Sequence, residues 1–285
     1  IAATVKRSNE IGGTPVAITF RPHPNVTLKP DLGVQLINSY DEKIELLETL
    51  GIKVVVEQPF SREFSNRKPE LFFQEELVER LNSKAIFVGH DFGFGKDRSG
   101  SLEVLKELCT KQGLELNITE PLKIDGELCS SSKIREYIKS GNVLSANRLL
   151  GRSFFYQGIV VRGDGRGKKL GFATANVQIH PKLQTKPGVY ATFATLISGD
   201  KKRLPSVTNI GFRPTFNVRD SSDQADLTIE THVFDFDKDI YGNHFRVEFI
   251  ERIRDEKKFD GIESLISQIS SDCLSSRQIL SAHRK

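Results

Sequence analysis

The spacing of hydrophobic residues changes near the middle of the chain, and this change constrains the fold more than any other feature. In the first half, short apolar runs alternate with amphipathic stretches. The expected strands cover residues 15–20, 54–56, 85–89 and 114–119, and the expected helices cover 41–50, 69–81, 102–112 and 131–140. Repeated alternation of strands and helices predicts a parallel sheet with helices on both faces.

The second half is rich in β-branched and aromatic residues and is interrupted by Gly, Pro and Asp turns. Strands are expected at residues 154–161, 176–179, 188–197, 204–211, 226–236 and 244–253. Such a series predicts an antiparallel barrel or sandwich. The last stretch, 262–280, has an apolar stripe with helical spacing and is expected to pack on the outside of the β domain. We therefore predict two domains, 1–145 and 146–285.

Composition agrees with this division and narrows the class of ligand. A chain of 285 residues is long enough for about two domains, each with its own core. The net charge of +4 is spread out without a dense basic tract, which favours small anions over nucleic acid. The three cysteines are far apart, as is typical of reduced thiols in a cytoplasmic protein. No apolar run is long enough to cross a membrane, and the oligomeric state is left open.

A glycine-rich stretch, 163–176, is the strongest candidate for a binding site. Gly163, Gly165 and Gly167 allow the backbone to turn its N–H groups toward one point, where Arg166 and Lys168 add positive charge. This pattern predicts a phosphate-binding loop, although a solvated hairpin loop is the alternative. It is not a Walker A loop, because the GxxxxGK[ST] pattern is absent and the residues that follow have the character of a strand.

Two polar residues directly after this loop are suited to a magnesium ion. In an extended segment side chains alternate, so Thr174 and Asn176 project from the same face. A hydroxyl and an amide carbonyl are hard ligands, and Mg²⁺ completes its coordination with phosphate oxygens and water. The spacing therefore predicts Mg²⁺ bound together with a phosphate.

In the first half, three segments follow predicted strands: 21–24 (RPHP), 89–95 (GHDFGFG) and 130–136 (SSSKIRE). Ligands of parallel sheets bind beyond the carboxyl ends of the strands. Ser131, Ser132 and Arg135 at a helix start form an anion site, with simple helix capping as the alternative. For His23 the alternative is a hydrogen-bonded loop histidine.

Together these motifs resemble the bacterial bifunctional riboflavin kinase/FMN adenylyltransferase (FAD synthetase) family. The segment GFATAN (171–176) is similar to the family's GFPTAN, with Ala173 in place of proline. The three segments of the first half resemble FxPHP, GxDFxFG and SST-x-IR. Residues 209–216 and 254–259 resemble NIGxRPTF and R-x-E-x-x-F. The resemblance covers nearly the whole chain.

The resemblance implies an N-terminal Rossmann-like nucleotidyltransferase domain and a C-terminal riboflavin kinase barrel with a packed helix. It implies phosphorylation of riboflavin to FMN by ATP with Mg²⁺, and adenylylation of FMN to FAD. Glu230, in the family's E-x-H context, would be the general base, although a solvated mid-strand glutamate is the alternative. The implied ATP contacts include His23, Ser131, Ser132 and Arg135, and the implied flavin contacts are Asp91, Phe92, Phe94, Arg254 and Phe259.

One departure from the family is large. The family's GxFDGxHxGH motif, whose histidines act on the transferred phosphate, is expected before Ile1, so we interpret the sequence as N-terminally incomplete. The sheet's first strand would then be missing, and FAD synthesis is expected only when that segment is present. The alternatives are a kinase-only enzyme or a non-catalytic flavin- or nucleotide-binding protein. A nucleic-acid-binding barrel is a further class, which the dispersed charge disfavours.

Overall fold

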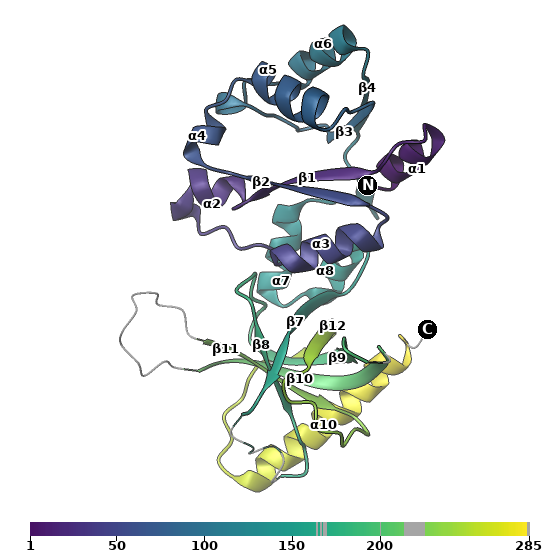
Figure 1. Cartoon of the computed structure of the whole chain (residues 1–285). Helices are drawn as coiled ribbons and strands as arrows, with labels where there is room; N and C mark the ends of the chain where they lie inside the picture. Colours follow the sequence, from purple (N-terminus) through teal and green to yellow (C-terminus); the bar gives the residue numbers. More distant parts are fainter. Residues whose placement is uncertain (164, 166, 168–169, 200, 214–225, 284–285) are drawn as a thin grey trace. The chain divides into compact units, whose positions relative to one another are not determined.

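The computed structural model describes residues 1–163, 165, 167, 170–199, 201–213 and 226–283. The chain divides into two compact units, Ile1–Lys123 and Ile124–Lys285, and each is described by itself (Figure 1). None of the helices in these described ranges is both long and apolar enough to cross a membrane. The cysteines are not linked by disulfides, and Cys109 is buried.

The first unit has the alternating elements that the sequence predicts. Its helices are α1 (Ala2–Glu10), α2 (Pro24–Leu28), η1 (Pro30–Leu32), α3 (Tyr40–Thr49), α4 (Arg62–Ser65), α5 (Pro69–Phe72), η2 (Phe73–Arg80), η3 (Lys96–Arg98) and α6 (Leu102–Gln112). Its strands are β1 (Val16–Arg21), β2 (Val54–Pro59), β3 (Ala85–Gly89) and β4 (Glu115–Thr119). The helix expected at 69–81 starts as α5 and continues as the π-helical η2, and Phe72 and Leu77, five residues apart, are both buried.

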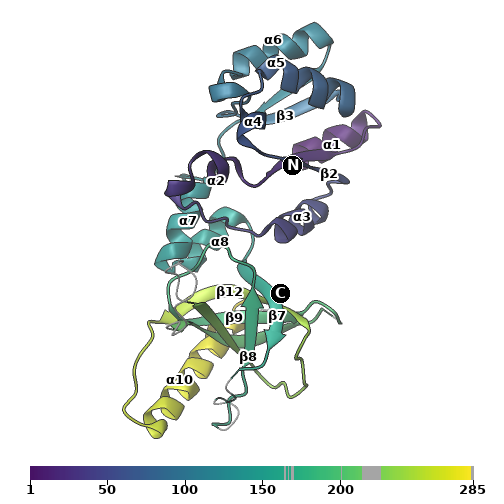
Figure 2. The ribbon, with the colours of Figure 1, turned by 60° about the vertical axis from the view of Figure 1, so that its left-hand side comes forward.

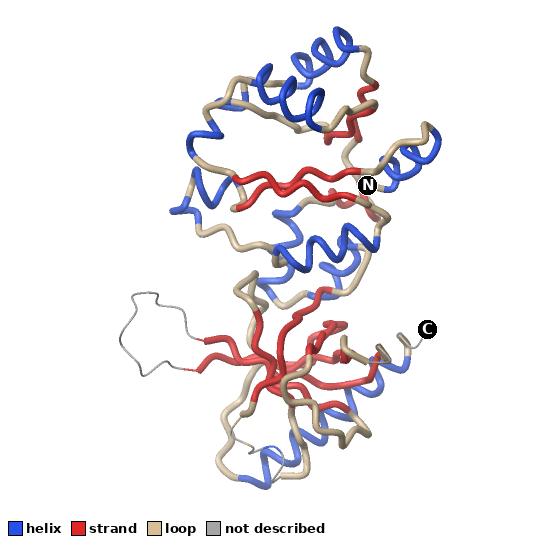
Figure 3. The backbone as a smooth tube through the Cα atoms, in the orientation of Figure 1, coloured by secondary structure: helices blue, strands red, loops and turns tan. Residues whose placement is uncertain are grey.

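The strands of this unit are parallel, as the alternation predicts, and they form two pairs (Figure 3). β1 pairs with β2 from Val16↔Val54 onward, and β3 pairs with β4 from Ala85↔Glu115 onward. A cavity of about 620 Å³ is lined by β1, by β3 and by side chains of α1. The pairs stay separate because, in the described part of the unit, no strand joins β1 to β3 across this cavity.

The second unit is a closed barrel, which confirms the barrel implied by the family resemblance, whereas the strand pattern alone left a barrel or a sandwich open. Its strands follow the order β10-β11-β8-β7-β12-β9 around the barrel. Their bounds are β7 (Phe154–Val161), β8 (Ala175–Ile179), β9 (Gly188–Leu196), β10 (Arg203–Arg213), β11 (Asp226–Val233) and β12 (His244–Arg254). The unit also contains the short strands β5 (Lys123–Ile124) and β6 (Glu127–Leu128) and the helices α7 (Ser131–Ser140), α8 (Val143–Leu150) and α10 (Ile262–Ser281).

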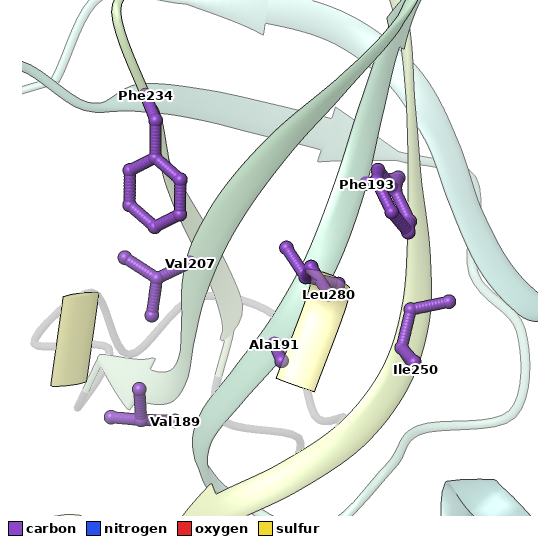
Figure 4. Close-up of a cluster of buried hydrophobic side chains, with 7 residues drawn as sticks. All are labelled: Val189, Ala191, Phe193, Val207, Phe234, Ile250 and Leu280. Carbon is purple, nitrogen blue, oxygen red and sulfur yellow. The ribbon is translucent and has the colours of Figure 1, made fainter. Parts of the chain in front are cut away.

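The helix α10 packs on the outside of the barrel, as the apolar stripe predicts (Figure 2). Leu280 of this helix lies in a buried cluster with side chains of β9, β10 and β12 (Figure 4). The Ser276 hydroxyl also donates a hydrogen bond of 2.8 Å to the Ser206 carbonyl of β10. On β9, Ala191 faces this helix, so its neighbours Tyr190 and Thr192 face the barrel interior, where both are fully buried.

Candidate functional site

Three polar residues form a row across neighbouring strands on the outer face of the barrel. Glu230 of β11 lies directly opposite Asn176 of β8 on one side and Asn209 of β10 on the other. Residues directly opposite in antiparallel strands share a face and lie close enough to act on one ligand. Thr231, the next residue of β11, is fully buried and points inward, so Glu230 points outward, where it is half-buried.

The glycine-rich loop folds back onto the residues that we predict to bind magnesium. A β-carbon on Gly163 would lie 2.3 Å from Asn176 Nδ2, and one on Gly167 would lie 2.4 Å from the Phe172 carbonyl oxygen. The same β-carbon on Gly167 would lie 3.3 Å from Thr174 Oγ1. These two glycines are therefore required for close approach, and each brings loop backbone against a candidate ligand. Arg166 and Lys168, which we predicted to bind phosphate, lie outside the described residues.

The residues at this site fit a magnesium ion that is bound through a nucleotide. Thr174 and Asn176 offer a hydroxyl and an amide oxygen beside loop backbone that glycine keeps accessible. Within the described residues there is no group of three or more His, Cys, Asp and Glu side chains that could hold a metal alone. Mg²⁺ needs few protein ligands when phosphates supply the others, so this small donor set is adequate.

A histidine of the strand that carries Glu230 contacts the segment just before the strand that carries Asn176. The imidazole Nδ1 of His232 lies 2.8 Å from the carbonyl oxygen of Ala173, the residue before Thr174. Its ring makes edge contacts with Phe172 and Phe234, with 5.7 Å between ring centroids in each case. β11 thus contacts the segment 172–174 through the His232 side chain, whereas its backbone pairing begins at Ala175.

Arg254, at the end of β12, and Phe259, in the segment that follows it, are the two residues of this half that we predicted to contact flavin. The Arg254 guanidinium binds both carboxylate oxygens of Asp272 in α10, at 2.6–3.1 Å, and these side chains are only 15% and 6% exposed. Its guanidinium carbon also lies 6.0 Å from the centre of the Phe259 ring. Arg254 therefore anchors the helix, and its role toward flavin stays a prediction.

The segment after Arg254 returns toward the polar row. Glu256 Oε1 lies 3.5 Å from Asn209 Nδ2, next to Gly211, where a β-carbon would lie 2.7 Å from that oxygen. The neighbouring Asp255 is held by Arg252 and Lys186, and hydrogen bonds to these cations lower its pKa to about 2. The segment therefore carries fixed negative charge at neutral pH.

The predicted site residues of the first unit lie in the segments after β1 and β3. The His23 side chain accepts a hydrogen bond from the Asn25 amide and caps α2, which is the alternative that we considered for it. Asp91 is exposed and Phe92 half-buried, and the Phe92 ring stacks on Phe94 at 5.5 Å. Phe94 is 8% exposed and belongs to the core, so a flavin would meet Phe92 first.

The serine-rich segment lies at the start of α7, which belongs to the second unit. Ser130 caps this helix by accepting a hydrogen bond from the Lys133 amide, so the capping role falls on this serine. Ser131 and Ser132 are exposed in the first turn. Burial lowers the pKa of Arg135. Ser131, Ser132 and Arg135 therefore lie together in the first turns of α7, whereas His23 and Asp91 belong to the other unit.

Two residues of the candidate site, Asn209 and His232, were not identified from the sequence. Asn209 stands in the predicted motif of 209–216, but its place beside Glu230 depends on the pairing of β10 with β11. Strand alternation does put His232 on the same face as Glu230, and this spacing could have indicated that the histidine belongs to the site. Its contact with Ala173 joins residues 59 positions apart, and no local pattern reports such a contact.

Comparison with protein families gives two matches that together span most of the chain. A model described as riboflavin kinase matches residues 150–280, and a model described as FAD synthetase matches residues 1–133. The first match contains the barrel and the polar row. The second contains the two parallel strand pairs and ends within the first turn of α7.

Curated relatives match along almost the whole length. The bifunctional riboflavin kinase/FMN adenylyltransferase of Bacillus subtilis is 35% identical over 276 residues, which cover 95% of this chain and 84% of the relative. The protein of the same name from Escherichia coli K12 is 31% identical over 264 residues, covering 92% and 82%. A solved structure described as a macrolide-efflux protein from Streptococcus pneumoniae has a TM-score of 0.83 and 29% identity, covering 95% of this chain and 86% of that one.

Proposed function

The chain belongs to the bifunctional riboflavin kinase/FMN adenylyltransferase family, and from this we propose that its barrel phosphorylates riboflavin to FMN with ATP. The observation that supports this assignment best is the strand register that sets Glu230 opposite Asn176, with the glycine-rich loop against Asn176. An acid–base group thus lies next to a phosphate-binding loop.

In the proposed mechanism Glu230 is the general base. Neighbouring strands lie about 4.8 Å apart, so a γ-phosphate held at Asn176 is within reach of a hydroxyl bound at Glu230. The terminal ribityl hydroxyl gives its proton to the Glu230 carboxylate as its oxygen bonds to the γ-phosphorus. The bond from that phosphorus to the bridging oxygen of ADP breaks, and the glycine-loop amides hold the phosphates in position.

Magnesium belongs to the proposal through Thr174 and Asn176. When bound, Mg²⁺ neutralises phosphate charge and so favours attack by an oxygen nucleophile. Thr174 and Asn176 present their oxygens on one face, and the close approach of Gly163 keeps the Asn176 amide beside the loop. Gly165, Arg166 and Lys168 complete the phosphate site of this proposal.

The riboflavin side is assigned to the other end of the polar row. Asn209, Glu256 and the segment that runs from Arg254 to Phe259 lie there. We assign Phe259 to contact with the isoalloxazine ring, and Arg254 to holding that segment through Asp272. Asn209 would orient the ribityl chain beside Glu230.

Adenylylation of FMN to FAD is assigned to the first half of the chain. The proposed flavin contacts are Asp91, Phe92 and Phe94, and the proposed ATP contacts are His23, Ser131, Ser132 and Arg135. We keep the functional boundary at 1–145 and 146–285, which places α7 with the adenylylating half. The proposed location is the cytoplasm, which the unpaired cysteines support.

A product assay tests both activities at once. The chain is incubated with riboflavin, ATP and Mg²⁺, and riboflavin, FMN and FAD are separated by chromatography. FMN is the expected product of the barrel, and FAD beside it would assign the second reaction to this chain as well. A folded chain, checked by circular dichroism, that yields neither FMN nor FAD would overturn the proposal.

Replacing Asn176 by alanine tests the metal assignment. Removing one ligand oxygen is expected to raise the Mg²⁺ concentration for half-maximal activity by about tenfold or more. The measurement is a magnesium titration of the initial rate at saturating ATP. Gln178→Ala, at an exposed position on the same face of β8, is the matched control and should titrate as the unmodified chain does. An unchanged titration for Asn176→Ala would remove this residue from the metal site.

A further inference from the structure

We propose that His232 is a positioning residue of the kinase site, which holds Thr174 in place through the Ala173 carbonyl. This inference rests on the proposed function, because it concerns how the nucleotide and metal ligands are kept in register. The hydrogen bond from Nδ1 to the Ala173 oxygen is 2.8 Å long, well within the range of a good N–H···O bond.

The chemistry of this contact determines which nitrogen of the imidazole carries a proton. A carbonyl oxygen can only accept a hydrogen bond, so Nδ1 must carry the proton and donate it. In the neutral ring, Nε2 is then the unprotonated nitrogen. Edge contacts with Phe172 and Phe234 restrict the rotation of the ring. Phe234 itself is buried among Val207 and Leu280, so the histidine is attached to the packed layer between the barrel and α10.

The contact stands where backbone pairing between the two strands stops. The pairing of β11 with β8 includes Glu230↔Asn176 and Thr231↔Ala175, and β8 begins at Ala175. Ala173 and Thr174 precede that strand, so the ladder that fixes Asn176 does not include them. Alanine also leaves the φ angle at position 173 unrestricted, whereas a proline ring would fix it. The side chain of His232 supplies the restraint at this point.

This restraint fixes the position of Thr174. Its backbone follows the held carbonyl directly, and its Oγ1 lies near Gly167 of the glycine-rich loop. If the carbonyl were free, Thr174 could turn away from the face that it shares with Asn176, and the hydroxyl would leave the magnesium and phosphate site. His232 therefore acts on ATP affinity through Thr174, without contact to the reacting atoms.

Two substitutions separate the hydrogen bond from the ring contacts. His232→Asn keeps an N–H donor at the position of Nδ1 but removes the aromatic ring, whereas His232→Phe keeps a ring against Phe172 and Phe234 but removes the donor. If the hydrogen bond positions Thr174, the Phe variant should bind Mg·ATP about tenfold more weakly, and the Asn variant should stay within about threefold of the unmodified chain. Riboflavin affinity should stay unchanged in both variants.

The readout is the dissociation constant of Mg·ATP by titration calorimetry, with riboflavin affinity measured separately. A second readout is hydrogen exchange at the Thr174 amide, which should speed up in His232→Phe and much less in His232→Asn. His244→Phe, at an exposed histidine of β12, is the control for loss of an imidazole elsewhere on the barrel. Equal ATP affinity in both His232 variants would overturn the positioning role, even where FMN formation confirms the kinase. Absence of FMN from the unmodified chain would instead overturn the proposed function.

Discussion

Replacing Glu230 by glutamine is expected to lower the rate of riboflavin phosphorylation by about 10²–10⁴-fold, the usual effect of losing a general base. Glutamine has nearly the same shape and can keep hydrogen bonds, but it cannot take up the proton of the attacking hydroxyl. Glu230 lies half-buried on the outer face of the barrel, opposite Asn176, so the fold should be unaffected. The measurement is the rate of FMN formation at saturating riboflavin and ATP.

Two further measurements make this experiment decisive. The affinity for Mg·ATP should stay within a few-fold, because the glycine-rich loop and Asn176 are unchanged. Glu251→Gln, at another half-buried glutamate of the same barrel, is the matched control and should keep full activity. Full activity in Glu230→Gln would exclude this residue as the base and favour the solvated-glutamate alternative.

Replacing Asp272 by alanine is expected to lower the free energy of unfolding by about 3 kcal/mol. The substitution leaves the Arg254 guanidinium, which is 15% exposed, without the carboxylate that binds it bidentately. It also removes the acceptor of a 2.9 Å hydrogen bond from Gln268. Urea unfolding followed by circular dichroism measures the change.

An exposed ion pair of the same type provides the control. Arg277 also binds both carboxylate oxygens of its partner, Asp235, but these side chains are 42% and 77% exposed. Because exposed pairs contribute little, Asp235→Ala should lower the free energy of unfolding by at most about 1 kcal/mol. Similar losses in the two variants would mean that burial of the Arg254–Asp272 pair does not matter for stability.

Local sequence patterns predicted most of the elements. The strand at 85–89 and the helices at 102–112 and 131–140 match exactly, because each has a clear period and clear end signals. The strand pattern did not predict closure of the barrel, which only the family resemblance implied, because β8 pairs with both β7 and β11 and strand order is set by long-range packing. The parallel strands of the first half were predicted, but their division into two pairs was not, since alternation predicts strands but not their neighbours.

The candidate site was predictable to the extent that it depends on neighbours in sequence. The glycines, Thr174 and Asn176 fall within 14 positions, and in the structure Gly163 approaches Asn176 and Gly167 approaches Thr174. The role of Asn209 beside Glu230 depends on strand register, which a single sequence does not report. The ion pair between Arg254 and Asp272 likewise depends on where α10 packs. The sequence alone therefore did not show that the charge of Arg254 is paired within the protein.

The cavity between β1 and β3 also determines how the first unit should unfold. In the described residues no strand carries backbone hydrogen bonds from one parallel pair to the other, so either pair can open without breaking the ladder of its neighbour. The barrel is the opposite case, because each of its six strands is bonded on both sides. Side chains of β1 and β3 nevertheless pack on one buried cluster, so amide exchange should report one weakly protected unit in the first half and a more strongly protected one in the barrel.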